Sequence, residues 1–371
     1  MKRIIISVTN DLTTDQRVDR VCKTLVRMGF DVLLVGRKLK NSLVLRERNY
    51  QTKRLHLLFR KGPLFYTEYN LRLFFFLLFR KADLYLSNDL DTLPANWLVS
   101  AIRHLPLVHD CHEYFRGVPE LNGRPGTLRI WKMIEDSIFP KLRNVYAVNE
   151  SIAQIYHKEY GKEVRVIRNM PFRRTQESKK TKKELSIPED HQVILYQGAV
   201  NVDRGLDEAI EAMKFLKTNA ILLIIGVGDI LLNLQDRVLK NGLSEKVLFT
   251  GQIPLEELSS YTVLADIGLS IEKDVSLNYH FCLPNKFLDY IQCNVPVLIS
   301  PLIEMKAIVE KYRIGEMITS HDPAYLAEKM DDMLNNKEKL AFYRENLKKA
   351  ASELCWENEE LELTRIFQDY V

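Results

Sequence analysis

Short apolar runs alternate with amphipathic segments along the first half of the chain. Residues 4–8 and 32–35 are apolar runs typical of buried strands, and between them the apolar residues of 18–26 recur at helical spacing. Gly29 follows that segment, where a glycine commonly ends a helix. Further apolar runs of the same half are 84–87, 105–109, 145–148 and 164–167. Continuous apolar strands joined through helices predict a parallel sheet covered on both faces.

The same alternation begins again after a polar, basic stretch at 173–183, which we expect to be a linker. The apolar runs that follow are 193–197, 221–225, 247–250, 267–270 and 297–300. We therefore expect an α/β protein of two Rossmann-like domains, 1–172 and 173–352, whose parallel sheets face a central cleft. A C-terminal helix over 353–371 is expected to pack back toward the N-terminal domain. A length of 371 residues fits two domains.

Composition narrows the class of protein without identifying its chemistry. Hydrophobic residues make up 46% and charged residues 27% of the chain, which is ordinary for a globular protein. The net charge of +4 fits anionic substrates and is too small to indicate nucleic acid. The five cysteines contain no C-x-x-C pair, so neither a disulfide framework nor a thiolate zinc site is expected.

The longest apolar run, 73–79, is far shorter than the ~20 residues of a membrane-spanning helix. No signal-peptide pattern precedes the first strand, so we expect a cytoplasmic protein. Basic residues surround the apolar run within 53–81, and such a stretch can lie on a membrane that carries a lipid-linked acceptor. A helix packed on the first sheet with charged ends also explains the stretch, and we favour that structural explanation.

Open α/β sheets bind ligands at the carboxyl ends of their strands, so functional residues are expected directly after strands. Gly198 follows 193–197, and a glycine there lets a ligand approach the backbone closely. Arg204 stands at the start of the next helix, where a guanidinium can clamp a diphosphate by bidentate hydrogen bonds. A tight turn with a solvated arginine explains the same segment. Gly226 follows 221–225 and on its own is typical of a plain strand-to-helix turn.

The segment 283–291 carries a helix start with three polar side chains of different chemistry. Asn285 and Asp289 are four residues apart and share one face of the predicted helix, with Lys286 beside them. An amide and a cation at a helix N-terminus suit a phosphate, and a carboxylate one turn deeper can accept two hydroxyls of a ribose. The alternative is a surface Lys–Asp pair worth about a few tenths of a kcal/mol.

His112 and Glu113 follow a strand of the first half. A histidine and a carboxylate there can orient a sugar hydroxyl or transfer a proton near neutral pH. A structural His–Glu pair is one alternative, and a metal site shared with His109 and Asp110 is another. Alternation along the extended segment places His109 and Asp110 on opposite sides, so we expect no metal.

Asp15 and Arg17 lie at the start of the first helix, on the acceptor side in this architecture. Asp15 suits the helix dipole, and Arg17 could contact an acceptor or a phosphate. A helix cap with a solvated arginine explains the pair equally well.

The segments around Arg204 and Asp289 resemble glycosyltransferase family 4, whose members are retaining enzymes of the two-domain GT-B fold. Arg204 with Gly205 is similar to that family's Lys-Gly or Arg-Gly near the start of the second domain. Asp289 matches the second of two acidic residues separated by seven positions, a motif followed by Pro-Val as at Pro296. The first acidic position falls on Phe281, so that carboxylate is missing here.

The resemblance implies a role for each of these side chains. Arg204 and Lys286 would stabilise the leaving diphosphate, and Asp289 would hold the ribose. His112 would face the donor sugar, with Glu113 as its neighbour and orienter. The resemblance implies neither a cofactor nor a metal.

Asp89 and Asp91 form an Asp-x-Asp sequence, which binds a divalent metal and a diphosphate in single-domain GT-A glycosyltransferases. Here the sequence follows a strand of a Rossmann-like half, so we expect turn and helix-cap chemistry from it.

We therefore expect an enzyme that transfers a sugar, with retention, from a nucleotide-sugar donor to a glycan or lipid-linked acceptor. One alternative is a nucleotide-sugar epimerase of the same architecture, which needs no acceptor. The other is a non-catalytic scaffold that binds a sugar nucleotide, which Phe281 and the short side chain of Asp289 keep open.

Overall fold

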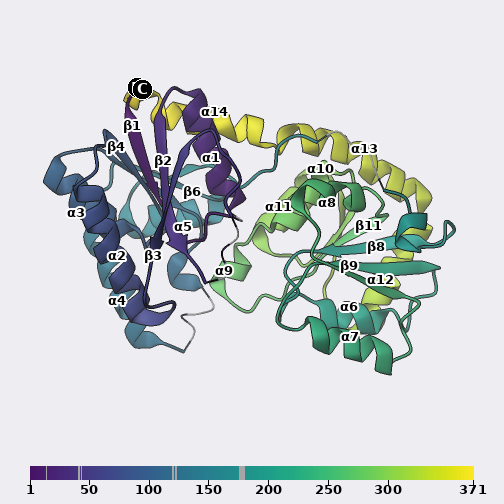
Figure 1. Cartoon of the computed structure of the whole chain (residues 1–371). Helices are drawn as coiled ribbons and strands as arrows, with labels where there is room; N and C mark the ends of the chain where they lie inside the picture. Colours follow the sequence, from purple (N-terminus) through teal and green to yellow (C-terminus); the bar gives the residue numbers. More distant parts are fainter. Residues whose placement is uncertain (14, 41, 43, 119–120, 122, 175–179) are drawn as a thin grey trace. The chain divides into compact units, whose positions relative to one another are not determined.

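The computed structural model describes residues 1–371 except 14, 41, 43, 119–120, 122 and 175–179. The chain forms two compact units: unit 1 comprises Met1–Asn169 with Asn358–Val371, and unit 2 comprises Met170–Glu357. Each unit has its own parallel sheet with helices packed on it (Figure 1). The expected pair of Rossmann-like α/β domains is thereby confirmed. The middle of the expected linker 173–183 lies outside the described residues.

Unit 1 is built on a seven-stranded sheet whose neighbouring strands all run parallel, in the order β3-β2-β1-β4-β5-β6-β7. Its strands are β1 (Arg3–Ser7), β2 (Asp31–Lys38), β3 (Gln51–His56), β4 (Leu84–Asn88), β5 (Leu107–Cys111), β6 (Asn144–Ala147) and β7 (Arg165–Val166). The central strands β4 and β5 are buried at every position, as continuous apolar runs predict. The apolar pattern did not reveal β3, because this edge strand has the sequence QTKRLH with a single apolar residue.

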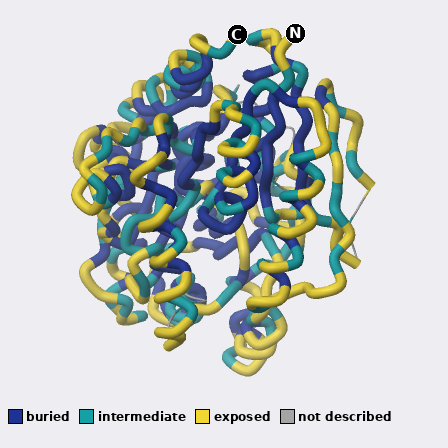
Figure 2. The backbone as a smooth tube through the Cα atoms, turned by 90° about the vertical axis from the view of Figure 1, so that its left-hand side faces the viewer, coloured by how far each residue is buried: buried dark blue, intermediate teal, exposed yellow. Residues whose placement is uncertain are grey.

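Helices cover the sheet of unit 1. They are α1 (Gln16–Arg27), α2 (Gly62–Leu78), α3 (Leu93–Arg103), α4 (Pro125–Ile138), α5 (Glu150–Tyr160) and α14 (Trp356–Phe367), with short 3₁₀-helices at Phe115–Gly117, Phe139–Lys141 and Gln368–Tyr370. The central strands are buried, whereas the outer turns of the helices are exposed (Figure 2). The end of the chain belongs to this unit, where Phe367 meets Phe30 edge-on with ring centroids 6.4 Å apart. Glu359 also accepts hydrogen bonds from the backbone and side chain of Arg168.

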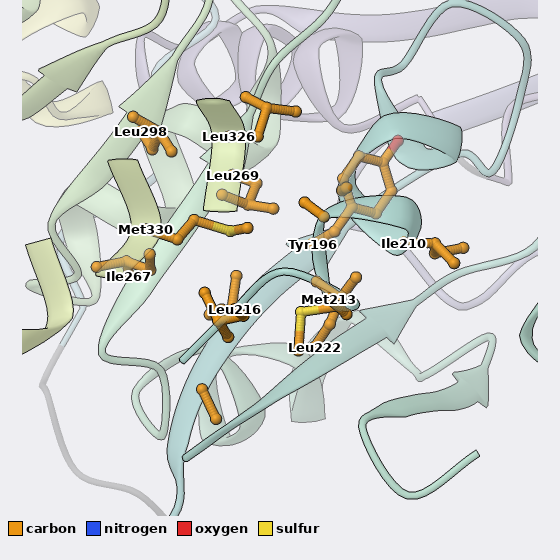
Figure 3. Packing of buried hydrophobic residues seen from close by; sticks show 14 of the residues in the cluster. Tyr196, Ile210, Met213, Leu216, Leu222, Ile267, Leu269, Leu298, Leu326 and Met330 are labelled. Atoms are coloured by element: carbon orange, nitrogen blue, oxygen red, sulfur yellow. The ribbon is translucent and has the colours of Figure 1, made fainter. Parts of the chain in front are cut away.

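Unit 2 has a six-stranded parallel sheet in the order β10-β9-β8-β11-β12-β13. Its strands are β8 (Gln192–Gln197), β9 (Ala220–Ile225), β10 (Val247–Gly251), β11 (Ile267–Ser270), β12 (Val297–Ile299) and β13 (Gly315–Met317). Its helices are α6 (Leu206–Ala212), α7 (Leu231–Lys240), α8 (Leu255–Thr262), α9 (Leu277–His280), α10 (Asn285–Gln292), α11 (Ile303–Tyr312), α12 (Pro323–Asn335) and α13 (Lys337–Glu353), with a short 3₁₀-helix at Lys183–Leu185. Figure 3 shows one side of its core, where Leu269 of β11 lies beside Leu326 and Met330 of α12.

Strand order predicts where each unit can bind a ligand. In unit 1 the order reverses between β1 and β4, and in unit 2 it reverses between β8 and β11. The chain leaves such neighbouring strands in opposite directions, which opens a crevice at their carboxyl ends. The loops that follow β1, β4, β8 and β11 are therefore the places to look for functional side chains. No helix of the described ranges is long and apolar enough to cross a membrane.

Candidate functional site

Three charged side chains meet at the carboxyl ends of β8 and β11 in unit 2. Glu272 follows β11 and is fully buried, and its Oε1 lies 2.5 Å from the Nζ atom of Lys286 on α10. Nη1 of Arg204, from the loop after β8, lies 3.7 Å from the same oxygen. The hydroxyl of Ser270 donates to the other oxygen of Glu272 at 3.0 Å. Two cations thus share one carboxylate, which leaves the cluster with a net positive charge.

Glu272 and Lys286 stay ionised in spite of their burial. Burial alone would raise the pKa of Glu272 and lower that of Lys286. The attraction between them outweighs burial, so the pKa of Glu272 is lowered and that of Lys286 is raised. Lys286 is only 7% exposed, and Nε of Arg204 is buried without a hydrogen-bond partner in the described parts of the chain. The cluster therefore holds cationic donors ready for an anion.

Aromatic rings support both cations. Nζ of Lys286 lies 4.1 Å from the centre of the Tyr196 ring, and the guanidinium of Arg204 lies 4.9 Å from that of Tyr279. Such contacts limit the rotamers of the two long side chains. The positions of the cations are therefore largely set before any ligand arrives.

The expected glycines permit close packing of two loops beside this cluster. Gly198 and Gly226 have φ values of 129° and 143°, which L-residues rarely adopt. A Cβ on Gly226 would lie 1.9 Å from the carbonyl oxygen of Gly198, so the two loops touch through their backbones. A Cβ on Gly198 would meet nothing within 4 Å, so the backbone there faces open space. Gly226 has a packing role, and Gly198 offers an exposed backbone.

The three polar residues predicted on α10 lie in different environments. Asn285 is exposed, whereas Lys286 and Asp289 are buried. Asp289 accepts a hydrogen bond from the side chain of Gln197 at 3.3 Å and lies 3.2 Å from Nη2 of Arg174. The surface Lys–Asp pair considered from the sequence is not formed, because Lys286 points to Glu272 instead.

Glu272 is the residue of this site that sequence reasoning missed. It stands two positions after the last residue of β11. The rule that functional residues follow strand ends would have indicated it, but no spacing motif drew attention to a single glutamate. Its role depends on partners far along the chain in Arg204 and Lys286, and these become neighbours only through the fold.

In unit 1 the loops after β4 and β5 are joined by one carboxylate. Oδ1 of Asp89 accepts from the backbone N–H groups of His112 at 2.8 Å and Glu113 at 3.3 Å. Its Oδ2 lies 3.9 Å from Nδ1 of His112. Asp89 has a positive φ of 57°, a conformation that is uncommon for a residue other than glycine. Asp89 therefore holds the backbone of the loop that carries His112 and Glu113.

The imidazole of His112 is suited to hydrogen bonding in its neutral form. Burial and the charge of Arg17 lower its pKa, although a third of the side chain (33%) is exposed. Burial and the nearby carboxylate of Glu113 raise the pKa of Asp89 well above its usual value. The negative charge of Glu113 therefore favours the protonated form of Asp89. The imidazole of His112 is partly exposed to solvent.

Arg17 does not occupy the acceptor-side position expected for it. Its side chain is 1% exposed and forms two hydrogen bonds with Asp110, at 3.1 Å and 2.8 Å, and a third with the carbonyl of Ile167 at 2.8 Å. Although burial opposes the charge, Asp110 raises the pKa of this guanidinium. Asp15 is the N-cap of α1 and accepts from Val18 N at 3.0 Å. The helix cap that one alternative expected is present. Arg17, however, is not solvated: it is buried and links α1 to Asp110 and to the carbonyl of Ile167.

The Asp-x-Asp sequence forms the turn after β4. Asp89 has a positive φ there, and the side chain of Asp91 is buried. Neither caps α3, whose N-cap is Thr92. Within the described residues, no group of three or more His, Cys, Asp and Glu side chains is arranged to hold a metal ion. His109 is buried beside Ser87 Oγ at 2.9 Å, and burial lowers its pKa to about 4, so it is a neutral structural histidine.

Replacing Asp91 by asparagine is expected to change how stability depends on pH. Asp91 accepts from the hydroxyl of Thr9 at 2.6 Å, and its other oxygen has no hydrogen-bond partner among the described residues. Burial raises its pKa from 3.8 to about 7, so the folded state holds a proton that the unfolded state releases. Ionising Asp91 therefore costs stability as the pH rises from about 4 to about 8. Over that range the free energy of unfolding of Asp91→Asn should rise relative to the parent, in urea titrations at several pH values. A constant difference would show that Asp91 does not titrate in this way.

Two family models match the sequence. One, described as Glycosyl transferases group 1, matches residues 177–352, and the other, described as Glycosyltransferase Family 4, matches residues 15–170. No curated protein matches the sequence significantly.

Several solved structures share the fold over the whole chain. Sucrose-phosphate synthase from Thermosynechococcus elongatus has a TM-score of 0.77 at 17% identity, covering 100% of this chain and 99% of that one. HepE from Anabaena, in complex with UDP-glucose, has a TM-score of 0.77 at 13% identity and covers 100% of both chains. WaaG, a glycosyltransferase involved in lipopolysaccharide biosynthesis, has a TM-score of 0.72 at 14% identity, covering 98% and 99%. At these identities the likeness is one of fold.

Proposed function

Because the chain is a group 1 glycosyltransferase of the GT-B type, we propose that it transfers a sugar from a nucleoside diphosphate sugar to a glycan or lipid-linked acceptor. The observation that carries this proposal is the buried cluster of Arg204, Glu272 and Lys286. A sugar leaves such a donor together with a growing negative charge on the diphosphate. Fixed cations in a buried site stabilise that charge more in the transition state than before it.

Within this cluster, each side chain has a separate task in our proposal. Lys286 and Arg204 bind the diphosphate, and Glu272 holds both cations in place. Gly198 lets the diphosphate approach the backbone, and Asn285 donates from the exposed start of α10. The structure of HepE contains UDP-glucose, which makes uridine diphosphate the first donor nucleotide to test.

Asp289 is proposed to hold the ribose of the donor. Its carboxylate already contacts Gln197 and Arg174, and these two side chains fix its orientation. A carboxylate has about four acceptor sites, so it can bind ribose hydroxyls while it keeps both partners. Aspartate reaches less far than glutamate, and Arg174 and Gln197 restrict its movement further.

For unit 1 we propose that the neutral imidazole of His112 contacts the donor sugar, with Asp89 as its positioning residue. The reaction is proposed to retain the anomeric configuration, as the family resemblance implies, and to need no metal or cofactor. An acceptor in a membrane would bring the protein to the membrane surface, so peripheral association belongs to the same proposal.

Replacing Arg204 by alanine should weaken binding of the donor nucleotide. Loss of one charge-assisted hydrogen-bonding group costs about 1.5–3 kcal/mol, which corresponds to about a 10- to 100-fold higher Kd. Calorimetric titration with a panel of nucleoside diphosphates, without added metal, measures this. Arg237→Ala is the matched control, because Arg237 forms only a half-exposed pair with Asp207 on the same unit. Equal affinity of Arg204→Ala and the parent would place the donor site elsewhere.

Product analysis tests the transfer reaction itself. The nucleotide that binds best is supplied as its diphosphate sugars, with glycan and lipid-linked acceptors, and products are separated by mass spectrometry. A glycosylated acceptor with free nucleoside diphosphate supports the proposal. An isomerised sugar nucleotide formed without acceptor would instead indicate an epimerase.

A further inference from the structure

A second basic site lies in unit 1, at the edge of the sheet. It is a cavity of about 270 Å³ at the carboxyl ends of β2 and β3, beside the segment that leads into α2. Eight residues line it: Arg37, Lys38, Leu39, Lys40, His56, Leu57, Phe59 and Arg60. Five of these side chains are basic and none is acidic. We call this cavity the edge pocket.

The basic side chains of the edge pocket differ from the arginines around them. Within the described parts of the chain, none of the lining Arg, Lys and His side chains forms an ion pair. Neighbouring arginines behave differently, since Arg54 pairs with Asp11 at 3.2 Å and Arg48 approaches Asp19 at 3.9 Å. Among the described residues, the surrounding arginines therefore have carboxylate partners, whereas the positive charge of the pocket is not balanced by a carboxylate. Crowded like charges repel one another, and a bound anion would relieve that repulsion.

Three of the basic side chains, those of Arg37, Lys38 and His56, belong to the paired strands β2 and β3. Lys38 and His56 face each other in the register of β2 and β3. Arg37 donates from Nη1 to the carbonyl of Arg60 at 3.3 Å, and its guanidinium lies 4.6 Å from the centre of the Phe65 ring. Its Nε atom is buried and has no hydrogen-bond partner among the described residues. Arg37 thus has a fixed position and an unused donor, which is the state expected of an arginine that awaits a ligand.

The turn beside the pocket presents apolar side chains to solvent. Leu58 is 79% exposed and Leu64 is 59% exposed. The carboxylate of Glu68 accepts from the backbone N–H groups of Leu58 and Phe59, at 2.9 Å each, so the turn is pinned to α2. At a phospholipid surface, the exposed leucines could contact the acyl chains while the basic pocket contacts the anionic headgroups.

We propose that the edge pocket binds a phosphate group, presented by a soluble acceptor or by a lipid headgroup. Guanidinium groups match the oxygens of a phosphate in pairs, and lysines add charge without demanding a fixed direction. The cavity is large enough for a phosphate or a diphosphate with part of its substituent. This site is separate from the donor cluster of unit 2, and the proposal does not depend on it.

Free phosphate provides the first test. The full chain carrying Arg204→Ala, which removes a donor-site cation, is titrated with inorganic phosphate and pyrophosphate by calorimetry. Adding Lys40→Glu and Arg60→Glu should weaken binding by about 10- to 100-fold or more, because each loss removes a charged donor. The matched control carries Lys81→Glu and Arg143→Glu, two exposed residues of the same unit without ion pairs. Unchanged unfolding midpoints would show that both variants fold.

Vesicles identify the source of the phosphate. The same proteins are sedimented with vesicles of phosphatidylglycerol or of phosphatidylcholine. Binding to phosphatidylglycerol that is lost in Lys40→Glu/Arg60→Glu, but kept in the control, supports a lipid headgroup. Binding of free phosphate without vesicle binding supports a phosphorylated soluble acceptor. If the pocket variant binds phosphate and anionic vesicles as the control does, or if the Arg204→Ala chain binds neither, the proposal is overturned.

Discussion

Replacing Asp110 by alanine is expected to destabilise unit 1 by about 3–5 kcal/mol. The change would leave the guanidinium of Arg17 charged and fully buried, and among the described residues it would keep one hydrogen bond, to the carbonyl of Ile167, and the nearby ring of Tyr146. Removing one member of a buried pair costs this much because the other member loses its compensation and cannot return to water. Arginine also cannot lose its proton, so the buried charge of Arg17 cannot be removed by deprotonation.

Urea unfolding followed by tryptophan fluorescence measures the loss. Two of the three tryptophans, Trp97 and Trp131, lie in unit 1, so the signal reports mainly on that unit. Lys23→Ala is the matched control: it breaks an exposed pair with Asp19 on the same helix as Arg17 and should cost less than about 1 kcal/mol. If Asp110→Ala lost no more unfolding free energy than the control, the buried Arg17–Asp110 pair would not stabilise unit 1 as proposed.

Periodicity predicted the sheets because buried parallel strands appear in a sequence as continuous apolar runs. It failed at β3, an edge strand in which no side chain is buried and a single residue is apolar. It also could not distinguish a solvated Arg17 from a buried one. That distinction depends on Asp110, which stands 93 positions later and becomes a neighbour only when α1 packs on the sheet.

The candidate sites show the same limit. The strand-end rule placed Gly198, Arg204 and His112 in the correct loops, because those loops follow strands whatever the remaining contacts are. The partners of these residues could not be predicted in that way. Asp89 binds the amide of His112, 23 positions along the chain, and Glu272 pairs with one cation from the loop after β8 and another from α10. Spacing along the chain identifies side chains that can act, and the fold determines which of them act together.

Replacing Lys286 by methionine is expected to lower the transfer rate by about 100- to 1000-fold, the effect of removing one buried donor to a developing negative charge. It should also destabilise unit 2 by up to about 3–5 kcal/mol, because Glu272 would keep only Arg204, at 3.7 Å, as a cationic partner. A loss of activity alone would therefore be ambiguous between a missing cation and a damaged fold.

A double variant separates the two causes. Glu272→Gln combined with Lys286→Met removes both charges of the buried pair, and replacing such a pair by neutral side chains of similar size is often close to neutral for stability. The double variant should therefore unfold at nearly the urea concentration of the parent, while its kcat and its affinity for the donor diphosphate stay as low as those of Lys286→Met. Recovery of activity together with stability would mean that Lys286 only supports the fold. Recovery of stability without activity would mean that the charge of Lys286 acts on the substrate, and that Glu272 is there to keep this charge buried and in place.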